Sequence, residues 1–82
     1  MKYVNYRVDT QAMNMSGTAL VSGWFVMGQR ETDLNWSYLG EVESEEEAIE
    51  YAKEHRKAHG LHKNCCIYNP AGMAYMHNGQ MA

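Results

Sequence analysis

The residues best suited to chemistry are histidines and cysteines near the end of a predicted helix. His55 and His59 are four residues apart and therefore share a helix face, and His62, Cys65 and Cys66 follow shortly after them. Imidazole and thiolate are preferred zinc ligands, so His55, His59, His62 and Cys65 are candidate metal ligands. The segment has neither a Cys-x-x-Cys pair nor the His-Glu-x-x-His motif. We therefore favour a structural role and expect no cofactor, because histidines are stabilised at a helix C-terminus by the helix dipole.

A cysteine with a histidine base is also a candidate nucleophile. Such catalysis needs a stabilised thiolate and an oriented base. The sequence has no glycine-rich loop to bind an oxyanion or phosphate beside these residues. We therefore expect a protein without enzymatic activity.

Acidic residues are concentrated in one part of the chain. Residues 31–50 contain eight of the ten Asp and Glu residues and no Lys or Arg. The glutamates at 45–47 are explained by the positive end of the helix dipole. The acidic residues outside the helix predict a surface that docks on a basic protein partner, because complementary charge speeds association and disfavours wrong partners. These candidate partner-binding residues are Glu31, Asp33, Glu41 and Glu43.

The apolar residues are unusual in kind, with seven Met, six Tyr and two Trp in 82 residues. Met adapts its shape, and Tyr and Trp tolerate partial exposure, so these residues suit binding surfaces as well as cores. Tyr and Trp are also enriched among the residues that dominate binding energy. Trp24, Trp36 and Tyr38, on the strands that flank the acidic loop, are therefore candidate anchors for the partner.

Nucleic-acid binding by the sheet face is the main alternative, and a small zinc-binding or redox protein that uses the His/Cys segment is the other. Aromatic side chains can stack on bases, but this requires a surrounding basic groove. The net charge of −3 disfavours such a groove. The basic residues available for this alternative are Arg7, Arg30, Lys53, Arg56 and Lys57.

The elements that must position these residues form one domain over residues 1–82, with the order β-β-β-α-β-β. We predict an α+β fold in which one helix packs on an antiparallel sheet. Alternation of apolar and polar residues predicts the strands, and their expected ranges are about 4–8, 18–30, 36–42, 64–68 and 73–77. Polar residues predict a loop at 10–17, and residues 78–82 are expected to fray.

The helix is expected over 45–59. Ser44 followed by Glu47 forms a capping box, and Gly60 is the left-handed residue that commonly follows a helix. The long second strand carries large apolar residues on both faces, and a single helix covers only one of them. The other face is therefore expected to contact a partner, and a second copy of the chain is one candidate.

No apolar run reaches the length of a membrane span, and the N-terminus lacks the apolar stretch of a signal peptide. The adjacent cysteines are not expected to form a disulfide, because that bridge would strain the peptide between them. These features predict a cytoplasmic protein with no membrane partner.

The order of elements resembles small bacterial and phage domains, including some anti-CRISPR inhibitors. The resemblance covers residues 18–79 and depends on the helix start Ser44-Glu45-Glu46-Glu47-Ala48-Ile49 and the turn Asn69-Pro70-Ala71-Gly72. These patterns are structural, so no functional residue is carried over. The resemblance implies a phage-type, anti-defence inhibitor that binds a host protein.

Overall fold

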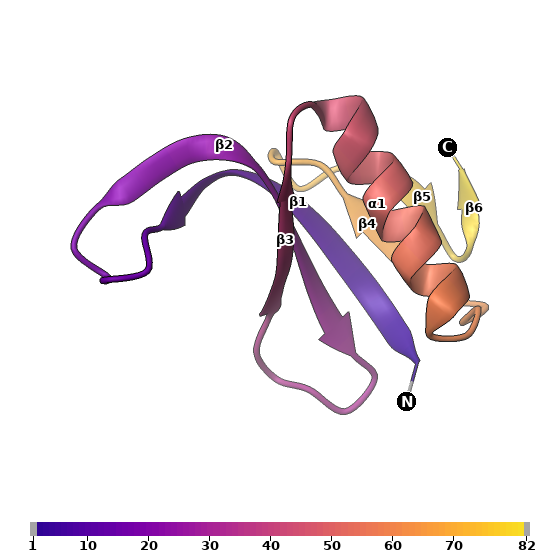
Figure 1. The fold of residues 1–82 in the computed structure, drawn as a ribbon. Helices are drawn as coiled ribbons and strands as arrows, with labels where there is room; N and C mark the ends of the chain where they lie inside the picture. Colours follow the sequence, from indigo (N-terminus) through magenta and orange to yellow (C-terminus); the bar gives the residue numbers. More distant parts are fainter. Residues whose placement is uncertain (1, 82) are drawn as a thin grey trace.

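The computed structural model describes residues 2–81 as a six-stranded sheet with one helix against one of its faces (Figure 1). The α+β class is confirmed. Within residues 2–81 no helix is both long and apolar enough to cross a membrane. The elements are β1 (Tyr3–Met13), β2 (Leu20–Arg30), β3 (Ser37–Val42), α1 (Glu45–Ala58), β4 (Cys66–Tyr68), β5 (Ala74–His77) and β6 (Gln80–Met81).

The sheet is mostly antiparallel, in the order β3-β2-β1-β4-β5-β6. The β1–β4 pair is parallel, which corrects the expectation of a purely antiparallel sheet. The chain direction explains this pair. The first three strands alternate in direction, so β3 is parallel to β1. The connection from β3 to β4 crosses over through α1, so β4 has the direction of β3 and is parallel to β1 as well.

The C-terminal end of the sheet differs from the prediction of fraying over 78–82. Gln80–Met81 forms β6, which pairs with β5. Asn78 and Gly79 form the intervening turn and both have positive φ, 51° and 80°. Two-residue hairpin turns of this kind favour Asn-Gly, so the sequence contains a local signal for this hairpin. Ala82, also in the predicted range, lies outside the described residues.

The hairpin between β1 and β2 is longer than predicted, because β1 continues through Met13 instead of ending before a loop at 10–17. β3 pairs with β2 only over residues 24–28, and β4 pairs with β1 only over residues 5–7. Residues 11–22 therefore form a two-stranded extension that we call the hairpin arm. The arm projects away from α1 in Figure 1.

The core lies between α1 and the centre of the sheet. Tyr6, Val8 and Val26 are fully buried on the sheet side, together with Ile67 of β4. The helix contributes Ala48 and Ala52, whose small side chains allow close packing. Partly buried hydrophobic residues complete the core, and they are Tyr3, Trp24, Leu39, Val42, Tyr51 and Tyr75.

Both ends of α1 agree with the predicted capping. The Ser44 hydroxyl accepts a hydrogen bond from the Glu47 N–H at 3.2 Å. The Glu47 carboxylate accepts one from the Glu43 N–H at 2.9 Å, one residue earlier than in the usual capping box. At the other end, His59 is the C-cap and Gly60 follows it with φ of 90°.

Substitution of the helix cap should lower the stability of the protein. Ser44→Ala removes the acceptor for the Glu47 N–H and should cost about 1 kcal/mol of unfolding free energy. Ser22→Ala, at an exposed strand position, is the control and should leave the free energy nearly unchanged. Urea unfolding of the two variants measures the difference, and equal midpoints would show that this cap contributes little.

Candidate binding surface

The sheet face opposite α1, which we call the back face, is uncovered within residues 2–81. Strand alternation places Tyr6 and Val8 toward α1, so Arg7 and Asp9 point to the back face. Phe25, which pairs with Asp9, is on this face too and is only 3% exposed. The back face therefore has a small apolar centre of its own.

A hollow of about 740 Å³ lies on the back face where the hairpin arm leaves the sheet. Four of its large apolar side chains remain open to solvent, with exposed fractions of 60% for Met13, 107% for Met15, 41% for Val21 and 57% for Tyr38. Large exposed apolar patches mark binding surfaces more often than isolated apolar residues do. The residues around the hollow are Ala12, Met13, Asn14, Met15, Val21, Phe25, Met27, Tyr38 and Glu41.

Some charged side chains of the back face form ion pairs and one does not. Arg7 and Asp9 form an ion pair at 3.0 Å, and the Arg7 guanidinium lies 4.7 Å from the centre of the Trp36 ring. Glu41 has no ion pair within residues 2–81. The unpaired charge beside the hollow is therefore negative.

The three predicted aromatic anchors are divided between the two faces of the sheet. Trp36 is half-buried under Arg7, and Tyr38 lies against Phe25 with ring centres 6.3 Å apart, both on the back face. Trp24 instead packs against the core on the side of α1. Of the three, Trp36 and Tyr38 can act on the same surface.

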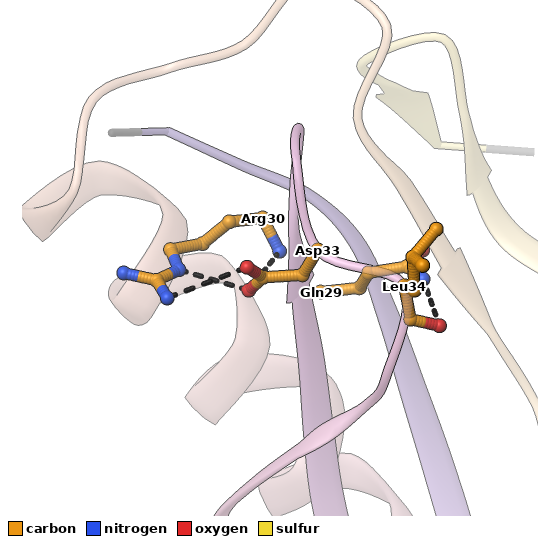
Figure 2. A network of polar contacts seen from close by, with 4 residues as sticks. All are labelled: Gln29, Arg30, Asp33 and Leu34. Atoms are coloured by element: carbon orange, nitrogen blue, oxygen red, sulfur yellow. Dashed lines mark hydrogen bonds and ion pairs between the residues drawn. The ribbon is translucent and has the colours of Figure 1, made fainter.

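Two of the predicted acidic residues, Glu31 and Asp33, are in the β2–β3 loop. Asp33 accepts hydrogen bonds from Arg30, including one from Nε at 2.9 Å, and this lowers the pKa of the Asp33 carboxyl (Figure 2). In the same network, the side-chain amide of Gln29 donates to the Leu34 carbonyl. Glu31 lies 3.7 Å from His62. Both carboxylates therefore have partners in the chain.

The other two predicted acidic residues, Glu41 and Glu43, lie at the opposite end of β3. Both line a hollow of about 480 Å³ that also includes Trp24. Next to it, a groove of about 490 Å³ runs between β3 and α1. We call it the front groove. Its residues are Val42, Tyr51, His55 and Ala58, with the helix carboxylates Glu47, Glu50 and Glu54.

The front groove was not predicted from the sequence. Glu47, Glu50 and Glu54 recur at the three- and four-residue spacing that aligns residues on one helix side, so this periodicity was a usable signal. Which element faces them could not be read from the spacing. It depends on the packing of α1 against the edge of the sheet.

The candidate metal ligands do not meet at one point. The rings of His55 and His59 stack with centres 4.1 Å apart, and His55 Nδ1 forms a hydrogen bond with the Tyr6 hydroxyl at 2.9 Å. His62 lies beside Glu31, and Cys65 is fully buried. Within residues 2–81 no three His, Cys, Asp or Glu side chains are grouped as a metal site requires. The arrangement fits a packed aromatic cluster under the end of α1.

Both cysteines are buried free thiols. Burial raises the pKa of the Cys65 thiol, which opposes formation of the thiolate that a nucleophile needs. Cys66, by contrast, lies 3.7 Å from His77 Nδ1 across β4 and β5, a pair that the sequence did not suggest. No hydrogen bond from the rest of residues 2–81 orients the other nitrogen of His77, so the pair lacks the third group of a catalytic triad.

The stability of the protein should decrease below about pH 6.5 because of His55. Burial and the neighbouring His59 lower the pKa of His55 from 6.5. The unfolded chain therefore binds a proton more tightly, and the unfolding free energy falls as the pH decreases from 6.5 through the folded pKa. His55→Gln should reduce this slope in urea unfolding measured across that range, whereas His77→Gln should retain it. An unchanged slope in His55→Gln would assign the pH dependence to other groups.

Comparisons of the chain with protein-family models, curated proteins and solved structures found no match. The resemblance in element order to phage and bacterial domains therefore stays a hypothesis.

Proposed function

We propose that this chain is a non-catalytic protein-interaction module that binds its partner through the back face and the hairpin arm. The observation that carries the proposal is the uncovered hollow with Met13, Met15, Val21 and Tyr38 exposed around it. A two-stranded extension has little stability alone, so an arm that exposes apolar side chains gains from a partner that covers it. Methionine and tyrosine are suited to such a contact.

The partner has apolar side chains flanked by positive charge. Glu41, at the border of the hollow, is unpaired within residues 2–81, and the chain as a whole has a net charge of −3. A second copy would bring more negative charge to this face, whereas a basic protein complements it. A heterologous partner is therefore the better fit.

Inhibition of a host defence protein is the specific role that we propose for this binding. It is supported by the element order, which resembles that of phage-encoded inhibitors. We also propose a cytoplasmic location, which is consistent with two free thiols.

Nucleic-acid binding is less well supported, because the basic residues named for it do not form one surface. Arg7 and Arg30 form ion pairs with Asp9 and Asp33 at 3.0 and 2.9 Å, and Lys53 and Lys57 alternate along α1 with the carboxylates of Glu50 and Glu54. Arg56 is half-buried, with its guanidinium against the His62 carbonyl. These residues are also distributed over both sides of the sheet and over α1.

Disruption of the back face should abolish partner capture. A Met13→Ser, Tyr38→Ser double variant removes two large apolar contacts at exposed positions, so the fold should persist while affinity falls about tenfold or more. The control is Leu34→Ser, Met73→Ser, which changes two exposed apolar residues that do not line the hollow. Tagged proteins are used to capture partners from a bacterial lysate, with the melting temperature of each variant as a check on folding.

Three results are informative. A protein retained by the wild type and the control but lost from the back-face variant supports the proposal. Equal capture by all three contradicts it. A wild-type dimer that becomes monomeric only in the back-face variant would identify a second copy as the occupant and would contradict the heterologous partner.

Charge reversal should act mainly on the association rate. Glu41→Lys, Glu43→Lys should slow association with the captured partner and weaken its salt dependence. Glu31→Lys, at the far end of the hairpin beside His62, should have a smaller effect. Binding kinetics measured at low and high salt test this. If the two changes act equally, Glu31 belongs to the same docking surface as Glu41 and Glu43, which then runs along the hairpin.

A further inference from the structure

We propose that the partner contributes an extended basic segment that adds as a strand to the free edge of β3, with alternate side chains in the back-face hollow and in the front groove. This inference rests on the proposed function, because it specifies which kind of partner segment binds beside the back face. Addition of a peptide strand to an exposed sheet edge is a recurrent mode of protein recognition.

β3 is the edge that can accept such a strand. It is the outermost strand at one side of the sheet and is six residues long, whereas β6 at the opposite side has two residues. Tyr51 of α1 donates a hydrogen bond to the Leu39 carbonyl at 2.9 Å, and its ring lies over Gly40. The helix is thus fixed beside the middle of β3, and the Glu41 side chain beyond it stays exposed.

The hollows around this edge are continuous. The back-face hollow and the hollow at the end of β3 share Glu41, and the latter shares Val42 with the front groove. A strand paired with β3 would lie about 4.8 Å away and direct successive side chains to opposite faces. One set of side chains would therefore enter the back-face hollow and the other set the front groove.

The two sides of the edge require different side chains. The back-face hollow is bordered by Tyr38 and other apolar groups. The front groove has an apolar floor and is flanked by Glu47, Glu50 and Glu54. Glu50 and Glu54 have only long, exposed contacts with lysines, at 3.6 and 3.7 Å, which a partner's cation can replace at little cost. The segment that fits alternates apolar residues with Lys or Arg.

The same charges disfavour a second copy at this edge. Pairing of β3 with another β3 would bring a second chain with a net charge of −3 to this acidic edge, and the two chains would repel each other. A basic segment turns this repulsion into attraction. The edge thus discriminates between the two occupants by charge.

Binding of designed peptides to the full chain tests the proposal. The probe is a blocked, fluorescently labelled peptide in which lysine and valine alternate. One comparison peptide has the same composition with all lysines at one end, and another has methylated backbone nitrogens that cannot pair with a strand. We expect the alternating peptide to bind about tenfold more tightly than either comparison peptide, and to shift the amide resonances of β3 most.

Variants locate the two sets of side chains. Glu50→Gln, Glu54→Gln should weaken binding of the alternating peptide about fivefold, and Tyr38→Ser should also weaken it. Glu46→Gln, which removes an exposed carboxylate that does not line the front groove, is the control and should leave binding unchanged. Equal affinity for all three peptides, or no binding, overturns strand addition. If Glu50→Gln, Glu54→Gln lowers the affinity for the alternating peptide but Tyr38→Ser does not, the two-sided arrangement is wrong. If the chain forms a dimer that requires the β3 edge, a second copy and not a basic segment occupies that edge.

Failure of this inference is distinguishable from failure of the proposed function. If the peptides do not discriminate but capture of the protein partner still depends on Met13 and Tyr38, the module binds through its back face without strand addition. If capture is independent of those residues, the proposed function itself is wrong.

Discussion

A mismatch in length between the single helix and the central strands determines the surface of this molecule. Fourteen helical residues extend about 21 Å, whereas the eleven residues of β1 or β2 extend about 36 Å. α1 therefore covers one face of the sheet over part of its length only. The hairpin arm therefore remains open, and the back face does too because residues 2–81 form only one helix; both surfaces contain apolar residues.

The covered part of the sheet is consolidated by small and aromatic residues. Ala48 and Ala52 bring α1 close to the sheet, and the fully buried Tyr6 retains a polar partner in His55. That hydrogen bond matters because a buried hydroxyl without one is costly. The same histidine borders the front groove, so the packing of the core and the shape of the proposed binding edge are linked through one side chain.

Irregularities in the strands decide which side chains share a face. A register shift in β1 between Tyr3 and Asn5 allows Tyr3 and Tyr6, three residues apart, to stack at 5.8 Å. In β3, a shift beside Leu39 likewise leaves both Tyr38 and Glu41 facing the back-face hollow. A bulge adds one residue to a strand and reverses the alternation beyond it. The candidate surface depends on these shifts. With strict alternation, Tyr38 and Glu41 would point to opposite faces of the sheet.

The sequence by itself determined the elements whose signals are local. The Ser44 cap and Gly60 predicted α1, and the alternation of Val4, Tyr6 and Val8 predicted the first half of β1, because capping and alternation depend on neighbouring residues. The tertiary structure alone decided the parallel β1–β4 pair, the separation of Trp24 from Tyr38, and the contact between Glu31 and His62, which are far apart in the sequence. These features depend on strand order, bulges and the position of one short helix, which are set by the burial of the whole chain and not by the spacing of any one segment.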